Sequence, residues 1–444
     1  MMPKISVGFR YTRRFALMVS IIAVSACGGS SGGAPAAAPQ FAYVANVTSG
    51  DVSAYTIDSS TGALTQIDCG GGTACNGANF SAGTSPRSVQ GTPSGKFLYV
   101  ANSGSGDVSA YNVATTGALT PINCGGGGGC NGANFMAGGS PTSLTVQPGG
   151  KFVYVANRNA IVAFSINSST GALLRLGCGG GAGCSGSDYM AGTDPYDVAV
   201  DPLGRYLYVT NLDAGGLGGT VSAFSLSLVT GALSKVACLG GAYPTCSGTN
   251  YLSGIAPIAL AVDPSGSFVH VATQTSITTG TYPSVAAFTI NAADGALQRD
   301  SCTGLGFAAA CSTFILDNFA VGGNPNAVGV APSGKFAYVA TTTGVSAYSL
   351  NPDASLNRID CGSGTGCTVM DFTAGSIATD IAFDAKGSYA YVANRGSNDV
   401  SVFAINSTTG MLTHVDCSAG AGAGCNGTDF AAGSGASAIA IVGG

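Results

Sequence analysis

The sequence predicts an all-β protein, a seven-bladed β-propeller of four-stranded antiparallel blades. One observation is a Tyr-Val strand motif that recurs seven times along the chain. Another is the composition: 70 of the 444 residues are Gly, only 8% are charged, and Glu is absent. Glu, Lys and Arg favour helices, whereas the abundant Gly, Val, Thr, Ser, Asn and Asp suit strands and tight turns. A third is a pair of cysteines in every repeat.

The first 27 residues are typical of a bacterial export signal. A basic segment precedes the apolar run Phe15 to Val24, and Ser25-Ala26-Cys27 follows. Val24-Ser25-Ala26-Cys27 resembles a lipobox, in which the cysteine is diacylated and becomes the mature N-terminus. We therefore expect export, by the general or the twin-arginine route, and a lipid anchor on Cys27 at the outer membrane or the cell surface. The alternative is an ordinary cleaved signal whose Cys27 is incidental.

Residues 28–40, GGSSGGAPAAAPQ, are predicted to form a flexible tether between the anchor and a propeller at residues 41–444. Without a bulky apolar residue, this segment should behave as a coil with a reach of roughly 20 Å. Loss of the leader removes four cations and leaves 12 against 21 Asp, a net charge of −9. We therefore expect no nucleic-acid partner, and membrane contact through the lipid anchor only.

Seven copies of the Tyr-Val motif divide the predicted propeller into repeats. Their spacing of 53 to 68 residues suits a four-stranded blade with one long loop. The copies are FAYVAN at Phe41, FLYVAN at Phe97, FVYVAN at Phe152, YLYVTN at Tyr206, FVHVAT at Phe268, FAYVAT at Phe336 and YAYVAN at Tyr389.

Each repeat is predicted to hold four strands in a fixed order. An inner strand such as Tyr196 to Val200 leads through an Asp-Pro-x-Gly turn to the Tyr-Val strand, and strands like Val52 to Ile57 and Leu64 to Ile67 follow. The chain starts at a Tyr-Val strand and finishes with Ser437 to Val442, an inner strand without followers. Together these ends complete one blade and close the ring without exposed edges.

The cysteines other than Cys27 fall into one pair per repeat, within short Gly-rich loops. An exported protein favours oxidation, so we predict seven intra-loop disulfides. Zinc is the alternative, but two thiols per loop without clustered His supply too few ligands. The predicted pairs are Cys69 and Cys75, Cys124 and Cys130, Cys178 and Cys184, Cys238 and Cys246, Cys302 and Cys311, Cys361 and Cys367, and Cys417 and Cys425.

The run Tyr99-Val100-Ala101-Asn102, followed by Gly106 to Tyr111 (GDVSAY) and Thr116 to Thr120 (TGALT), closely resembles the YVTN-type, lactonase-like β-propeller family. The resemblance covers about residues 41–444 and implies seven blades. The family includes 6-phosphogluconolactonases and muconate-lactonizing relatives. In its enzymes a Pro-Arg-His segment opens an inner strand, and His, Arg and Glu residues are implicated around the channel. Pro86 and Arg87 match that segment, whereas Ser88 stands in the place of the His.

Most cations of the propeller align with turns or outer strands, where they serve the scaffold. Three remain near the channel mouth and are the leading ligand-contact candidates: Arg87, Arg158 and Arg395. Of the two histidines, His270 replaces the recurrent Tyr and is expected to be packed in the core, and His414 is expected to be solvated on an outer strand.

Asp197 and Asp380 occupy the same early position on two inner strands, where the other repeats carry Ser or Ala. Tyr196 and Asn326 lie one position earlier, as Arg87 does. These side chains are expected to form a polar pocket that binds a ligand or a cation, or that activates water on a lactone. Two carboxylates are too few to assign a metal, and we predict no cofactor. The alternative is that Arg87 pairs with one aspartate and water fills the channel.

Two functions follow as hypotheses. The first is a non-catalytic envelope propeller that binds or scaffolds a protein, a glycan or a small molecule through its disulfide-pinned loops. The alternative is a divergent lactonase that hydrolyses a lactone at the central channel, with Asp197 or Asp380 as the base. A third interpretation, a structural surface component, shares the features of the first.

Overall fold

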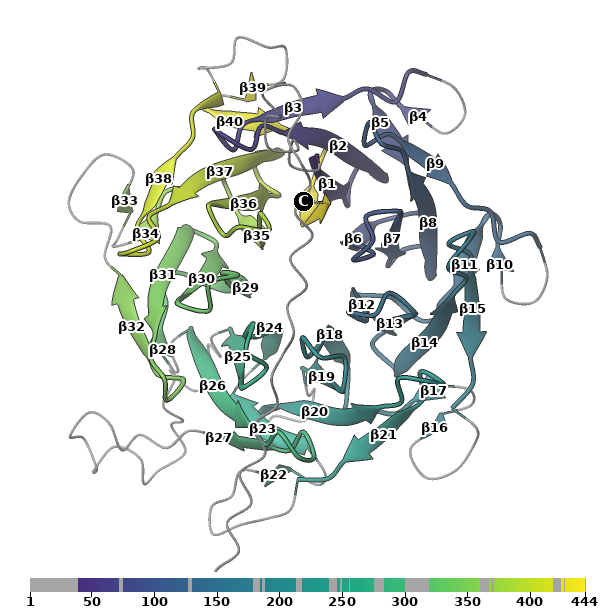
Figure 1. Cartoon of the computed structure of the whole chain (residues 1–444), viewed down its shortest axis with the longest axis vertical. Helices are drawn as coiled ribbons and strands as arrows, with labels where there is room; N and C mark the ends of the chain where they lie inside the picture. Colours follow the sequence, from purple (N-terminus) through teal and green to yellow (C-terminus); the bar gives the residue numbers. More distant parts are fainter. Residues whose placement is uncertain are drawn as a thin grey trace, which may run out of the picture. The chain divides into compact units, whose positions relative to one another are not determined.

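Seven antiparallel sheets form a ring around a central channel in the computed structural model of the chain (Figure 1). The structure describes residues 39–71, 75–126, 130–178, 184–185, 188–212, 218–238, 246–247, 250–254, 256–274, 283–299, 319–359, 367–368, 371–417, 425–426 and 428–443. The predicted export signal, Cys27 and nearly all of the tether lie outside these residues. Within the described part of the chain, no helix has the length and apolar character needed to cross a bilayer.

The strands that border the channel are the inner strands, and a second strand pairs with each of them. The inner strands are β6 (Pro86–Gly91), β12 (Ser143–Val146), β18 (Pro195–Val200), β24 (Pro257–Val262), β29 (Pro325–Val330), β35 (Ala378–Phe383) and β41 (Ala436–Gly443). The second strands are β1 (Gln40–Asn46), β7 (Phe97–Asn102), β13 (Phe152–Ala156), β19 (Tyr206–Asn211), β25 (Phe268–Thr273), β30 (Phe336–Thr341) and β36 (Tyr389–Asn394).

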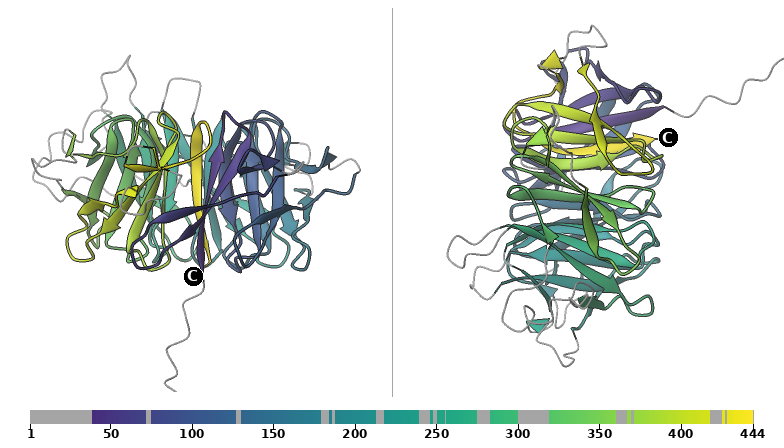
Figure 2. Two further views of the ribbon diagram at one scale, coloured as in Figure 1. Left: turned by 90° about the horizontal axis from the view of Figure 1, so that it is seen from above. Right: turned by 90° about the vertical axis from the view of Figure 1, so that its left-hand side faces the viewer.

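Two further strands complete each predicted blade. The third strands are β2 (Asp51–Ile57), β8 (Asp107–Val113), β14 (Ile161–Ile166), β20 (Gly219–Leu226), β26 (Ser284–Ile290), β31 (Gly344–Leu350) and β37 (Asp399–Ile405). The outer strands are β3 (Leu64–Ile67), β9 (Leu119–Pro121), β15 (Leu173–Leu176), β21 (Leu233–Val236), β27 (Leu297–Arg299), β32 (Leu356–Ile359) and β38 (Leu412–His414). The predicted seven-bladed propeller is thus confirmed, and Figure 2 shows its sheets side by side around the ring.

The ring closes as the sequence predicts, by pairing the last strand with the first. Strand β41 runs antiparallel to β1, with Tyr43 opposite Ala440 and Phe41 opposite Val442. Figure 1 shows these two segments, the ends of the propeller, side by side in one blade. The Ser437 hydroxyl donates to the Ala45 carbonyl at 2.9 Å and to the Pro86 carbonyl at 2.8 Å, so the closing strand also contacts the next blade.

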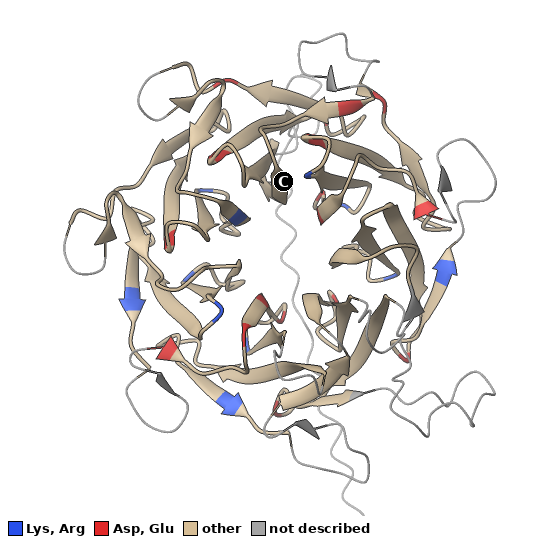
Figure 3. Ribbon diagram, turned by 180° about the vertical axis from the view of Figure 1, so that it is seen from behind, with Lys and Arg blue, Asp and Glu red and all other residues tan. Residues whose placement is uncertain are grey.

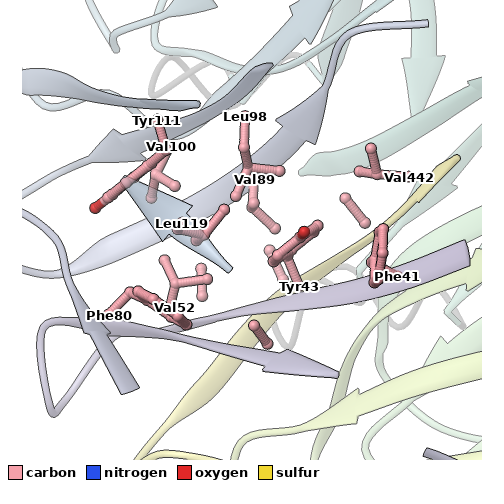
Figure 4. Close-up of a cluster of buried hydrophobic side chains, with 14 residues drawn as sticks. Phe41, Tyr43, Val52, Phe80, Val89, Leu98, Val100, Tyr111, Leu119 and Val442 are labelled. Carbon is pink, nitrogen blue, oxygen red and sulfur yellow. The ribbon is translucent and has the colours of Figure 1, made fainter. Parts of the chain in front are cut away.

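The cysteine loops add a short hairpin that the four-stranded prediction did not include. Its strands are β4 (Cys75–Asn76) and β5 (Asn79–Ser81), β10 (Cys130–Asn131) and β11 (Asn134–Met136), β16 (Cys184–Ser185) and β17 (Asp188–Tyr189), β22 (Cys246–Ser247) and β23 (Asn250–Gly254), β28 (Phe319–Ala320), β33 (Cys367–Thr368) and β34 (Asp371–Phe372), and β39 (Cys425–Asn426) and β40 (Asp429–Ala431). In blade 1 the hairpin extends the sheet beside β2, with Phe80 opposite Val52. The Phe80 ring enters the core between blades 1 and 2 (Figure 4).

Two of the predicted disulfides lie wholly among the described residues, and both are formed. They join Cys69 to Cys75 and Cys124 to Cys130. Cys178, Cys238 and Cys417 are also disulfide-bonded. The side chains of Cys184, Cys246, Cys302, Cys311, Cys361, Cys367 and Cys425, to which the other predicted pairs refer, lie outside the described part of the structure.

The recurrent tyrosine of the second strand joins five of the blades to the next one. The buried Tyr99 hydroxyl donates to the Gly171 carbonyl at 2.9 Å, in the turn that precedes the outer strand of blade 3. Tyr43, Tyr154, Tyr208 and Tyr338 make the equivalent hydrogen bond at 2.7 to 3.1 Å. His270 takes this position in blade 5 and is fully buried, as predicted, and burial lowers its pKa to about 4, so it packs as a neutral ring.

We expect Tyr99→Phe to lower the free energy of unfolding by about 1 kcal/mol, because it leaves the buried Gly171 carbonyl without its donor. Tyr391→Phe is the matched control, since the Tyr391 hydroxyl is buried at the same position of blade 7 with no hydrogen-bond partner among the described residues. Urea unfolding of both variants measures the difference. Equal loss of stability in the two variants would contradict the inter-blade role of this hydroxyl.

Candidate functional site

A polar cavity of about 190 Å³ lies at the mouth of the channel and takes lining residues from all seven blades. The residues come from the first positions of the inner strands and from the turns that follow the second strands. Six of the predicted site residues meet there, namely Arg87, Tyr196, Asp197, Asn326 and Asp380 from inner strands and Arg395 from a turn. Arg158 does not line the cavity, although the sequence grouped it with the other two arginines.

The second position of the inner strand normally ties one blade to the next. The Thr379 hydroxyl donates to the Ala436 carbonyl at 2.9 Å, and Ser437 makes the same link to Pro86. Asn326 also belongs to this group, because its side-chain amide donates to the Ala378 carbonyl at 2.7 Å. Asn326 therefore links blades 6 and 7, whereas the sequence predicted it as a ligand contact. Arg87 and Tyr196 occupy this position without such a link.

The third position carries the two aspartates, and it links blades as well. The Ser88 hydroxyl accepts the backbone N–H of Leu144 at 3.1 Å. In the same way, Asp197 Oδ2 accepts the N–H of Leu260 at 2.8 Å, and Asp380 Oδ2 accepts that of Ile439 at 2.9 Å. Because a neutral serine makes this link, the negative charge of the aspartates is not needed for it.

The two carboxylates differ in how many donors they have. Asp197 Oδ1 accepts the Ser143 hydroxyl at 2.6 Å and the N–H of Val198 at 2.9 Å. Asp380 Oδ1 accepts only the N–H of Ile381, at 2.8 Å, among the described residues. A carboxylate can accept about four hydrogen bonds, so Asp380 has more free acceptor capacity toward the cavity.

Burial raises the pKa of both carboxyl groups. For Asp380 the pKa is raised to about 7, first by burial and further by the negative charge of Asp197, although two backbone donors oppose the change. Burial also raises the pKa of Asp197, and its three hydrogen bonds partly offset that effect. Asp380 is therefore poised to exchange a proton near neutral pH, which is the property required of a general base.

Arg87 and Arg395 are exposed at the rim of the cavity and form no ion pair with any described residue. Arg87 Nε donates to the Ser103 hydroxyl at 3.1 Å, and neither aspartate of the cavity pairs with it. The alternative in which Arg87 neutralises one of these aspartates is therefore not what the structure shows. Figure 3 places the other charged residues mostly in turns and on outer strands.

The remaining arginines with described side chains have partners. Arg175 pairs with Asp188 at 2.6 Å, Arg358 with Asp371 at 2.8 Å, and Arg205 with Asp201 at 3.1 Å. His414 follows the same rule, because its Nε2 lies 2.8 Å from Asp429 Oδ1 and its ring meets Phe403 edge-on. His414 lies partly exposed at the end of the outer strand, and the structure adds a contact with Asp429 of the hairpin that the sequence did not predict.

Gln274 and Ile258 are among the lining residues that sequence reasoning missed. Gln274 stands directly after a second strand, at the position of Arg395, and its side-chain amide donates to the Pro325 carbonyl at 3.3 Å. That shared position is the signal that would have identified it. Ile258 aligns with Arg87 and Tyr196 and gives one wall an apolar surface. Among the described residues, no three His, Cys, Asp or Glu side chains are arranged to hold a metal ion.

A seven-bladed propeller with a polar cavity at its channel mouth defines the structural class. The chain belongs to the family described as "Lactonase, 7-bladed beta-propeller", which matches residues 36–131, 75–247 and 318–424. A 6-phosphogluconolactonase from Formosa agariphila is 30% identical over 164 residues, which are 35% of this chain and 40% of that protein. The matched segment thus spans about two-fifths of the relative's length.

Solved structures support the fold. A candidate 6-phosphogluconolactonase from Bacteroides fragilis superposes with a TM-score of 0.64 at 18% identity, over 92% of this chain and 99% of that one. The periplasmic gluconolactonase of Pseudomonas aeruginosa gives a TM-score of 0.60 at 16% identity, over 91% of this chain and 99% of that one. At these identities the likeness shows the propeller fold alone.

Proposed function

We propose that the protein hydrolyses a small lactone that carries an acidic group, in the cavity at the channel mouth. The observation that carries the proposal is that one cavity holds both a carboxylate suited to act as a base and two arginines that form no ion pair with described residues. Asp380 has a pKa raised to about 7 and free acceptor capacity, and Arg87 and Arg395 line the same cavity without ion-pair partners among the described residues. Family membership and the 6-phosphogluconolactonase relative support this hypothesis better than the partner-binding one.

The reaction is the opening of a cyclic ester by water. Asp380 takes a proton from a water molecule while that water's oxygen bonds to the lactone carbonyl carbon. The tetrahedral intermediate then breaks its ring C–O bond, and the proton held by Asp380 passes to the alkoxide, which gives a hydroxy acid and restores the carboxylate. The guanidinium groups of Arg87 and Arg395 supply positive charge to the acidic substituent or to the developing oxyanion.

The test is hydrolysis of a lactone panel by the oxidised domain from Gln40 onward, followed by pH-stat titration. The panel contains 6-phosphogluconolactone, the uncharged glucono-lactone and γ-butyrolactone. We expect turnover, with the largest kcat/KM for the phosphorylated lactone. A folded domain with intact disulfides that turns over none of the three would overturn the proposal.

The two rim arginines give a prediction about substrate charge. We expect Arg87→Gln and Arg395→Gln each to raise KM for 6-phosphogluconolactone by about 10-fold or more, because each removes a charge-assisted contact. KM for the uncharged lactone should change by less than about 2-fold. Lys96→Gln, in a turn outside the cavity, is the matched loss of charge. Equal increases in KM for the charged and uncharged lactones would contradict a contact with the acidic group.

A further inference from the structure

Tyr196 forms part of the cavity wall, and its ring is contacted by Arg158, which forms an ion pair with Asp194. The guanidinium carbon of Arg158 lies 5.6 Å from the centre of the Tyr196 ring. Arg158 Nη1 lies 3.1 Å from Asp194 Oδ2 and 3.3 Å from Asp194 Oδ1, so a single nitrogen contacts both oxygens. Asp194 lies two residues before Tyr196, and Arg158 comes from the preceding blade. The pair therefore connects blades 3 and 4 beside the ring.

The backbone of Arg158 departs from the pattern of the other blades. The residue that follows the six-residue Tyr-Val motif, Arg395 in blade 7 and Arg158 in blade 3, usually donates its N–H to the residue that precedes the inner strand of its own blade. Arg395 does so to Ile377 at 2.9 Å. Arg158 instead has a φ of +63° and donates its N–H to the Pro195 carbonyl of the next blade. Arg158 lies at the tip of the short turn between β13 and β14, in which the Asn157 N–H donates to the Ala160 carbonyl at 3.1 Å, and hairpin turns this short commonly need a positive φ.

The ion pair of Arg158 contributes little to stability. The Arg158 side chain is 43% exposed and that of Asp194 24% exposed. Exposed ion pairs of this kind typically contribute about 0–1 kcal/mol. The contact between the Arg158 guanidinium group and the Tyr196 ring therefore points to a role in positioning that ring.

The surroundings of Tyr196 leave its hydroxyl edge for a ligand. Arg158 approaches one side of the ring, and the apolar cluster between blades 5 and 6 that contains Ile258 packs against the side chain. The Tyr196 hydroxyl makes no hydrogen bond to any described residue, whereas most of the recurrent core tyrosines bond a backbone carbonyl. Tyr196 comes from blade 4, while Arg87 and Arg395 come from blades 2 and 7.

We propose that Tyr196 determines substrate specificity through a hydrogen bond from its hydroxyl to a ligand oxygen, and that Arg158 and Asp194 are positioning residues for its ring. The inference rests on the proposed function. A ligand that fits both sides of the cavity carries an acidic group near Arg87 and Arg395 and a hydrogen-bonding oxygen elsewhere on the molecule, near Tyr196. An alkyl lactone lacks that second group.

The test compares Tyr196→Phe, Arg158→Met and their double variant in the domain from Gln40 onward. The probes are 6-phosphogluconolactone for turnover and 6-phosphogluconate for binding by calorimetry. We expect each single variant to weaken binding of the acid and to raise KM by about 5-fold with kcat within about 2-fold, since one neutral hydrogen bond is lost. The double variant should be no weaker than either single one, because both changes remove the same contact.

Two controls separate positioning from loss of structure. Arg175→Met breaks an ion pair of the same type on an outer strand and should leave KM and binding unchanged. Arg158→Lys keeps the charge without the planar guanidinium and should restore only part of the affinity.

Wild-type KM and affinity in both Arg158→Met and Tyr196→Phe would overturn this proposal and leave lactone hydrolysis standing. Weaker binding in Tyr196→Phe alone would overturn the positioning role of Arg158. A wild-type domain that binds the acid without turning over the lactone would overturn the proposed hydrolysis, whereas the binding comparison would still decide the role of Tyr196.

Discussion

Asp380→Asn should lower kcat/KM for lactone hydrolysis by about 10²–10⁴-fold, the range expected when a general base is removed. The amide has nearly the same size as the carboxyl group but cannot take a proton from water. Its oxygen can still accept the N–H of Ile439, which lies 2.9 Å from Asp380 Oδ2. Steady-state rates with 6-phosphogluconolactone measure the change. Activity within about 10-fold of wild type would rule out Asp380 as the base.

A second variant separates the chemistry from the link between blades. Asp380→Ser copies Ser88, whose hydroxyl accepts the equivalent backbone N–H from the next blade at 3.1 Å. We expect Asp380→Ser to fold and to remain as inactive as Asp380→Asn. Asp197→Ser should retain most of the activity, because Asp197 is already committed to three hydrogen bonds.

The same carboxyl group predicts the pH dependence of the rate. A general base must be ionised, so kcat/KM should rise with pH through an apparent pKa of about 7, the value to which burial and Asp197 raise Asp380. Asp197→Ser removes the neighbouring negative charge and should move this midpoint to lower pH. A pH profile that is flat between pH 5 and 9 would contradict the assignment.

Stability should change with pH in the opposite direction. In the folded protein Asp380 holds its proton up to about pH 7, whereas in the unfolded chain it loses it near the ordinary value of 3.8. Its contribution therefore favours folding at low pH and is lost as pH rises toward 7. Asp380→Asn removes this contribution, so its stability relative to wild type should improve as pH rises over that window.

The fold could be predicted from the sequence because every blade repeats the same physical solution. The recurrent tyrosine is conspicuous because most copies make the same contact, a hydrogen bond to a turn carbonyl of the next blade, as Tyr99 makes to Gly171. The closing strand could be predicted as well, because the last inner strand has no following strands in its own repeat and can pair with the first Tyr-Val strand. The hairpins were missed because their strands are only two to five residues long and lie in Gly-rich loops.

The candidate site could be predicted only where side chains break the repeat. Asp197 and Asp380 stand out among Ser and Ala, and the structure places both in the cavity. The sequence does not show which polar side chains already have partners in neighbouring blades. Asn326 donates to the Ala378 carbonyl, and Arg158 forms an ion pair with Asp194. Both assignments depend on contacts between neighbouring blades, which alignment of the repeats within one chain does not contain.

Gly171→Ala should destabilise the propeller by about 2–4 kcal/mol, the largest effect we expect from a single methyl group. Gly171 has a φ of +71°, a conformation that L side chains rarely adopt. A Cβ atom there would also overlap the Phe97 ring and would lie 2.6 Å from a methyl carbon of Ile122, both in the preceding blade. Because the interior between blades is close-packed, neither neighbour can move without opening that interface.

Gly125→Ala isolates the packing contribution. Gly125 has a similar φ of +81°, but a Cβ atom there would meet no other atom within 4 Å. This control should therefore suffer only the backbone strain, about 1 kcal/mol. Urea unfolding of both variants gives the difference, which measures how tightly one blade packs on the next. A loss of stability in Gly171→Ala no greater than in Gly125→Ala would mean that the blades adjust to the extra methyl group, and would contradict the close packing expected around this turn.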